Sequence, residues 1–67
     1  MTLYFENSYG ERRIIATPNN EAEAIGEIHK FCGDREFKIY YTRTWIDDSG
    51  AKVFDVGSHT EFFYLEE

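Results

Sequence analysis

The sequence predicts an α+β fold, with an antiparallel sheet that carries one helix on one face, in the order β-β-α-β-β-β. Short runs of aromatic and β-branched residues, separated by Asn, Asp and Gly, are typical of strands and turns. Residues 21–32 have instead the apolar spacing of a helix. The longest strand-like run, residues 36–46, is apolar on both alternating faces, so we expect it to be the central strand.

A β-hairpin is predicted at the start of the chain. Residues 2–6 and 11–17 are the two strands, and residues 7–10 form a tight turn because Asn and Gly tolerate positive φ. Alternation along the second strand would place Ile14 and Ala16 on one face and Arg13 and Ile15 on the other.

The helix has two candidate starts. Asn20 can be the N-cap, with Glu23 completing a capping box, or Thr17 can cap with Pro18 in the first helical position. The helix should reach about Cys32, with Gly33 as its C-terminal cap. Its apolar half consists of Ala24, Ile25, Ile28, Phe31 and Cys32.

The second half of the chain is predicted to be three strands. Residues 47–50 form a turn after the central strand, residues 51–56 return, and residues 62–65 form the last strand. The run Ser58–Glu61 also fits a capping box, so the alternative is one helical turn before the last strand or in its place.

One helix can cover only one face of this sheet. The other face would expose several of Tyr4, Ile15, Tyr40, Phe54 and either Phe62 or Phe63. An apolar patch of that size usually marks an interface, so we expect a homo-oligomer, most simply a two-fold dimer.

Composition narrows the class of protein. The 67 residues are enough for a single domain, residues 1–67. A net charge of −6 argues against direct binding to duplex nucleic acid, but it permits binding to a basic protein surface. A single cysteine, no signal peptide and no long apolar run predict a cytoplasmic protein without membrane contact.

No motif indicates catalysis, so we expect no enzyme, no cofactor and no metal. Ser58 and His59 are adjacent and would point apart in a strand, which excludes a nucleophile–base pair between them. His29 and Cys32 are three residues apart on the helix and could share a metal with His59, but a packed helix edge explains them better.

The candidate ligand-binding residues combine arginines with aromatic rings, which could clamp a phosphate and stack a base. The simpler explanation is exposed strand arginines paired with the abundant acids. Local acidic clusters, at residues 21–27, 47–48 and 66–67, could imitate a phosphate array or form an ordinary solvated surface. The candidate ligand-binding set is Arg12, Arg13, Tyr40, Tyr41, Arg43, Trp45 and His59.

Three segments carry a family resemblance: F-E-N-S-Y-G-E-R-R near the start, Y-Y-T-R-T-W in the middle and D-V-G-S-H-T-E-F-F-Y-L at the end. They resemble small proteins encoded by phages and prophages of Gram-positive bacteria. The resemblance covers most of the chain and implies a setting, the infected bacterial cell, without assigning residues to a mechanism.

The resulting expectation is a non-enzymatic phage accessory protein that counters host defence by binding and inhibiting a defence component. The alternative is an oligomer that sequesters a nucleotide immune signal in an interfacial pocket. In that case Arg12, Arg13 or Arg43 would hold phosphate, and Tyr40, Tyr41 or Trp45 would stack the base. A structural or virion role is a third option.

Overall fold

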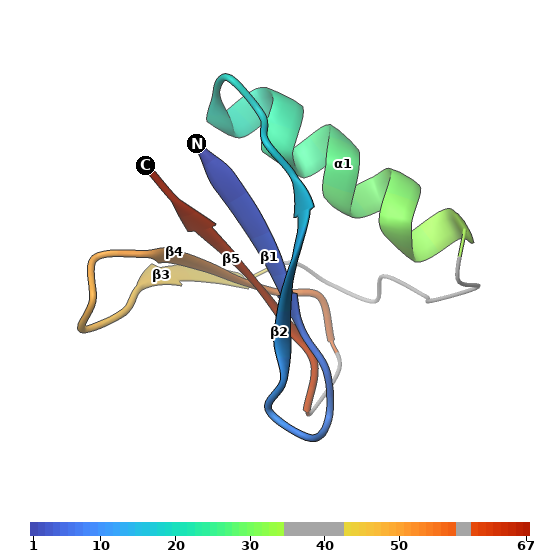
Figure 1. Cartoon of the computed structure of the whole chain (residues 1–67), viewed down its shortest axis with the longest axis vertical. Coiled ribbons are helices and arrows are strands. Elements are labelled where there is room, and N and C mark those ends of the chain that lie inside the picture. Colours follow the sequence, from blue (N-terminus) through green and yellow to red (C-terminus); the bar gives the residue numbers. More distant parts are fainter. Residues whose placement is uncertain (35–42, 58–59) are drawn as a thin grey trace.

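A computed structural model describes residues 1–34, 43–57 and 60–67 of the chain. One helix packs against one face of a five-stranded antiparallel sheet, which confirms the predicted α+β class and element order (Figure 1). The elements are β1 (Thr2–Glu6), β2 (Arg12–Ala16), α1 (Glu21–Asp34), β3 (Arg43–Ile46), β4 (Lys52–Asp55) and β5 (Phe62–Glu66).

The strands lie in the order β2-β1-β5-β4-β3, so β5 is the central strand and joins two local hairpins. The prediction that residues 36–46 form the central strand is wrong for the part described. Its last four residues are β3, which lies at the sheet edge and is exposed throughout. Residues 36–42 of that predicted strand lie outside the described residues.

The start of α1 confirms the Asn20 cap. The backbone N–H of Glu23 donates to Oδ1 of Asn20 at 2.9 Å, and Glu23 Oε1 accepts from the backbone N–H of Asn19 at 3.1 Å. The predicted end is wrong: α1 continues through Gly33 to Asp34. Gly33 is not among the glycines with positive φ, so it does not make the left-handed turn that a terminating glycine supplies.

The core lies between α1 and the facing side chains of β1, β4 and β5. Leu3, Phe63 and Ala24 are fully buried, and Ile28 is 3% exposed. Three phenylalanine rings meet in this core in tilted or edge-to-face contacts, with the Phe5 and Phe31 centroids 4.7 Å apart and Phe63 within 5.6 Å of both. Ile25, predicted within the apolar half of the helix, lies at its edge and is 42% exposed.

A register shift in the first hairpin changes which residues of β2 face the core. Leu3 pairs with Ala16, whereas Tyr4 pairs with Ile14, so the extra residue between them breaks the simple alternation. Ile15 and Ala16 therefore both pack against the core, and Ile14 is 60% exposed. The predicted grouping of Ile14 with Ala16 is wrong for this reason.

The predicted composition of the uncovered face is wrong for three residues, for Ile15 because of this register shift and for Phe54 and Phe63 because they pair with each other on the helix side. Ile15, Phe54 and Phe63 belong to the core with the helix and are not available on the opposite side. Tyr4 and Phe62 are only half buried and lie on that side, whereas Tyr40 lies outside the described residues.

The two hairpin turns, predicted at residues 7–10 and 47–50, are confirmed and built alike. In each, the side-chain oxygen of the first residue, Asn7 or Asp47, accepts backbone N–H groups two and four residues further on, at 2.9–3.0 Å. Each turn ends in a glycine with positive φ, Gly10 at 80° and Gly50 at 89°. Local side-chain chemistry therefore fixes both connections.

The last strand is confirmed as β5, and the described residues 60–67 contain no helical turn. The start of the alternative capping box, Ser58 and His59, lies outside the described residues. None of the described helical residues belongs to a helix long and apolar enough to cross a membrane.

Candidate functional site

Helix α1 lies on one side of the sheet (Figure 1). The opposite side, on which no described helix packs, is here called the uncovered face, and it carries side chains from all five strands. Pairing from strand to strand aligns five of them in one line across the sheet. We call this line the aromatic row; it consists of Ile14, Tyr4, Tyr64, Val53 and Trp45, in spatial order. Its ends are the most exposed, with Ile14 60% and Trp45 40% exposed, while Val53 at 2% is buried.

A second line, the arginine row, runs beside the first. Glu6 pairs with both Arg12 and Phe62, and Arg43 pairs with Asp55. Because Phe54 pairs with Phe63, the next residues along, Asp55 and Phe62, are neighbours as well. The arginine row therefore consists of Arg12, Glu6, Phe62, Asp55 and Arg43, with an arginine at each end and a carboxylate next to it.

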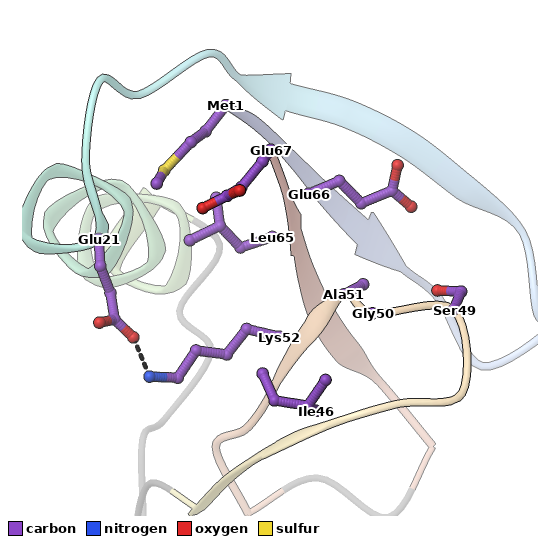
Figure 2. Close-up of a pocket in the computed structure, with 10 residues that line it drawn as sticks. All are labelled: Met1, Glu21, Ile46, Ser49, Gly50, Ala51, Lys52, Leu65, Glu66 and Glu67. Carbon is purple, nitrogen blue, oxygen red and sulfur yellow. Dashed lines mark ion pairs between the residues drawn. The ribbon is translucent and has the colours of Figure 1, made fainter.

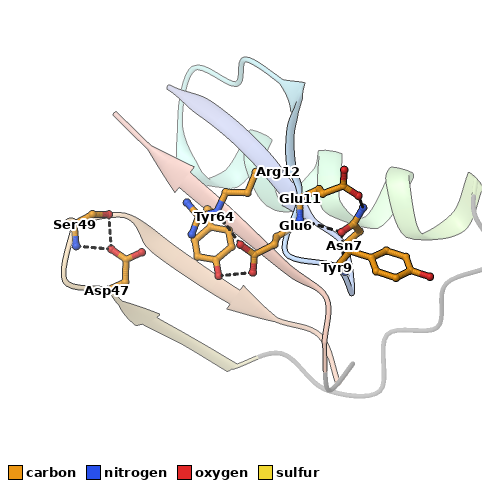
Figure 3. A network of polar contacts seen from close by, with 8 residues as sticks. All are labelled: Glu6, Asn7, Tyr9, Glu11, Arg12, Asp47, Ser49 and Tyr64. Atoms are coloured by element: carbon orange, nitrogen blue, oxygen red, sulfur yellow. Dashed lines mark hydrogen bonds and ion pairs between the residues drawn. The ribbon is translucent and has the colours of Figure 1, made fainter.

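At the β2 end of this row, Arg12 is held on two sides (Figure 3). Its Nε donates to Glu6 Oε1 at 2.9 Å, and its guanidinium carbon lies 3.7 Å from the centre of the Tyr64 ring. The Tyr64 hydroxyl donates to Glu6 Oε2 at 3.1 Å. Desolvation by burial, reinforced by the hydrogen bond to Glu6, raises the pKa of Tyr64 above its usual value of 10.0.

At the β3 end, Arg43 has the same two kinds of neighbour, a carboxylate and an aromatic ring. Its Nη2 lies 3.0 Å from Oδ2 of Asp55, which is only 4% exposed, and its guanidinium lies 5.4 Å from the Trp45 ring centre. The second Asp55 oxygen accepts the backbone N–H of Gly57 at 3.0 Å. Trp45 also contacts Phe62 edge to face at 6.3 Å between ring centroids.

Three of the predicted ligand-binding residues share the uncovered face, with Arg43 and Trp45 together on edge strand β3 and Arg12 on the opposite edge strand, β2. Arg13 is not with them: it pairs with Phe5, and its guanidinium lies 5.7 Å from the Phe31 ring, on the helix side. Tyr40, Tyr41 and His59 lie outside the described residues.

Sequence reasoning missed the carboxylates Glu6 and Asp55 and the ring of Tyr64. Glu6 and Arg12 flank the predicted turn at 7–10, so hairpin pairing was a signal that could have connected them. The predicted turn at 47–50 gives the same signal for Arg43 and Asp55, which pair across the β3–β4 hairpin. No local signal connects Tyr64 to Arg12, because that contact requires β5 to lie beside β1.

The helix side of the molecule has a different electrostatic character. Helix α1 contains three glutamates and one aspartate against a single lysine, Lys30. One of the glutamates, Glu21, forms an ion pair with Lys52 of β4. Glu23 supports the helix cap, yet no ion pair of the described residues neutralises it or Glu27.

A cavity of about 530 Å³ lies between the start of α1, the β3–β4 turn and the two ends of the chain (Figure 2). Leu65, Ile46 and Met1 supply apolar walls, and Glu21 and Glu67 supply carboxylates. The Glu66 carboxylate points away from that of Glu67 (Figure 2). The Glu21–Lys52 ion pair crosses one side of this cavity.

Several residues of the predicted acidic clusters form hydrogen bonds or ion pairs that stabilise the fold. Asp47 holds the β3–β4 turn, and hydrogen bonds from Ser49, chiefly from its hydroxyl, lower the pKa of that carboxyl. Glu21 and Glu23 serve the ion pair and the cap described above. The outward acidic character therefore rests on Glu23 and Glu27 together with Asp48, Glu66 and Glu67.

The metal-ligand candidates are separated in the structure. Cys32 is buried in the core, where desolvation raises the pKa of its thiol, whereas His29 is exposed. Within residues 1–34, 43–57 and 60–67, no three His, Cys, Asp or Glu side chains are grouped so that they could hold a metal ion.

Comparison with protein-family models, curated proteins and solved structures finds no match.

Proposed function

We propose that the protein is a non-enzymatic phage accessory protein that inhibits a component of bacterial host defence by binding it. The acidic helix side would contact a basic surface of that component, such as its nucleic-acid-binding groove. The observation that carries this proposal is the division of charge: Arg12 and Arg43 are paired with carboxylates on the uncovered face. On the helix side, where Glu21 is paired with Lys52, the remaining carboxylates of Glu23, Glu27 and Glu67 outnumber the cations of Arg13 and Lys30.

Such a division favours a basic partner for two reasons. Carboxylates on a broad surface raise the rate of encounter with a positive groove and repel nucleic acid itself. A lysine or arginine side chain of the partner could also lay its apolar stem along Leu65 and Ile46 in the cavity while its charge meets Glu67.

The setting comes from the resemblance to small proteins of phages and prophages. A protein made during infection meets host defence proteins in the bacterial cytoplasm, and many of these act on nucleic acid. We therefore propose that the partner is one of them and that inhibition needs binding alone.

The test is phage plating on Gram-positive strains that each carry one defence system, with and without the expressed protein. We expect plating to be restored on at least one strain and to depend on acids of the helix side. Glu27→Lys, on α1, should abolish the restoration. Glu11→Lys, in the β1–β2 turn, makes the same change in net charge and should keep it.

Two outcomes would contradict the proposal. Failure to restore plating on any strain would count against an anti-defence role. Equal activity of Glu27→Lys and Glu11→Lys would count against the acidic helix side. With the susceptible component purified, the affinity of the complex should also fall as salt concentration rises, because the proposed contact is electrostatic.

A second candidate, sequestration of a nucleotide immune signal, is favoured by the meeting of arginines and rings on the uncovered face. Arg12 lies over Tyr64 and Arg43 beside Trp45. It ranks second because both guanidiniums already bind carboxylates, and a phosphate would have to displace Glu6 or Asp55.

Calorimetry against a panel of cyclic and adenine-containing nucleotides separates the two candidates. Sequestration requires binding that Arg43→Ala weakens about ten- to a hundredfold, the loss of one charge-assisted hydrogen bond. It also requires that heating release the nucleotide intact. No binding by the wild type leaves the protein-binding proposal ahead, and a degraded nucleotide would show that the protein is an enzyme.

A further inference from the structure

We propose that the uncovered face binds a second copy of this chain, and that two copies pack face to face as a two-fold dimer. This inference goes beyond the proposed function, which uses the opposite side of the molecule. In this arrangement both acidic helix sides point outward. Three features of the uncovered face favour this partner: its area, its charge and its side chains.

The area of the face suits a small dimer. The molecule has an accessible surface of 4475 Å² and extents of 27 × 22 × 20 Å. One face of a body with these proportions holds roughly a sixth of the surface, which is on the order of the 800 Å² that each partner buries in a standard interface. The aromatic row alone crosses all five strands, a span of about 19 Å at the usual strand spacing.

The charge of the face favours a copy of the same chain. In an isologous interface each copy presents the same patch, so a patch with a net charge opposes its own association. The arginine row avoids this cost because Arg12 is matched by Glu6 and Arg43 by Asp55. The helix side, where Glu23, Glu27 and Glu67 outnumber Arg13 and Lys30, would repel its own copy.

The internal pairing also lowers the cost of removing water from the face. Both Arg12 and Tyr64 donate to the Glu6 carboxylate, and Asp55 accepts from both Arg43 and the backbone N–H of Gly57. Polar groups that already have partners lose less on burial than groups that depend on water. Burial of Ile14 and Trp45, by contrast, is a direct gain.

The residue types match those that dominate protein interfaces. Trp, Tyr and Arg are enriched at the energetic centres of interfaces, and this face combines Trp45, Tyr64 and Arg12 with the apolar end residue Ile14. Along the two rows a highly charged partner would find no excess of opposite charge, and the one further carboxylate of β5 on this side, Glu66, lies at the end of that strand. A second copy, apolar and electrically balanced in the same places, fits these features.

The chain offers a closely matched pair of variants as a test. Ile14 and Ile46 are both isoleucines on edge strands and are 60% and 63% exposed. Ile14 lies on the uncovered face, whereas Ile46 lines the cavity on the helix side. Ile14→Lys and Ile46→Lys therefore change the charge and the exposed apolar area alike, on opposite sides of the sheet.

Sedimentation velocity at micromolar concentration should give twice the monomer mass of 7.9 kDa for the wild type. Ile14→Lys should raise the dimer dissociation constant about tenfold or more, because the substitution occurs twice in each dimer. Ile46→Lys should leave the constant unchanged. A wild type that stays monomeric would overturn the proposal, and so would a dimer that Ile46→Lys weakens and Ile14→Lys does not.

Trp45 supplies an independent readout, since it is the only tryptophan in the chain and lies on the uncovered face. Its fluorescence should shift to the blue as protein concentration rises through the dimer dissociation constant. The Ile14→Lys variant, checked for an unchanged far-UV circular dichroism spectrum, should show that shift only at higher concentration. An emission maximum that does not move while the mass doubles would place the interface elsewhere.

Discussion

The two faces of the sheet achieve burial by different means. On the covered face, Leu3, Phe54 and Phe63 are at most 1% exposed because α1 lies over them. On the uncovered face, Val53 and Asp55 are almost as well buried, at 2% and 4%, although α1 lies on the other side of the sheet. There the neighbouring strands supply the contacts: Arg43 forms an ion pair with Asp55, and Val53 is paired with Tyr64 on one side and Trp45 on the other.

This difference teaches that a small sheet can protect its second face with its own long side chains. The covered face depends on excluding water from apolar groups, a non-directional effect. The uncovered face depends on specific pairs, such as Arg12 with Glu6 and Arg43 with Asp55. Substitutions on the two faces should therefore destabilise the protein by different mechanisms and by different amounts.

The largest effect is expected on the covered face. Ile28, 3% exposed, lies at the centre of the apolar side of α1, and Ile28→Asp would bury a charge without a partner. The cost is several kcal/mol, a large share of the roughly 5–15 kcal/mol that stabilises a typical native protein. We expect the variant to be unfolded by circular dichroism.

The control for Ile28→Asp is Ile25→Asp, on the same helix but 42% exposed, which should keep the native spectrum with a small loss in melting temperature. A native spectrum and an unchanged melting temperature for Ile28→Asp would show that the faces of α1 have been assigned wrongly.

An intermediate effect is expected from Asp55→Ala on the uncovered face. This change removes the acceptor for Arg43 and for the backbone N–H of Gly57. Loss of a buried, charged acceptor should lower the free energy of unfolding by about 1.5–3 kcal/mol in urea titrations. Asp48→Ala, in the exposed β3–β4 turn, should change it by no more than about 0.5 kcal/mol. Equal stabilities for the two variants would contradict the importance of side-chain pairing on this face.

The smallest effect concerns the ionisation of Tyr64. Its pKa is raised in the folded state, chiefly by desolvation, so folding favours the neutral phenol. The resulting stability is fully present below the usual pKa of 10.0 and is lost as pH rises through the raised value. Tyr64→Phe should therefore lose less stability than the wild type between pH 9 and 11, measured as melting temperature. Tyr9→Phe, at a position 86% exposed, should follow the wild type.

Much of the fold could be predicted because its signals are local. The turns at Asn7 and Asp47, the cap at Asn20 and the apolar spacing around Ile28 each depend on residues a few positions apart. The element order follows from them. What failed was long-range: β3 was predicted at the centre, because Trp45 and Ile46 give it two apolar sides, yet both are exposed at the edge.

The candidate site was predictable only in part, for the same reason. Arg12, Arg43 and Trp45 were identified as residue types, but their common face depends on β5 lying between the two hairpins. The register shift opposite Leu3 and Tyr4 reversed the side taken by Ile14, and alternation alone cannot reveal a bulge.

The position of β5 has a consequence for how the chain folds. Thr2 of β1 pairs with Glu66 of β5, so the centre of the sheet joins the two most distant parts of the sequence. The β1–β2 and β3–β4 hairpins can close locally and early, whereas the sheet is completed only when residues 62–66 are available. During synthesis, the residues of both hairpins and of α1 are therefore made before the strand that completes the sheet. A chain ending before residue 62 would lack the strand that joins them.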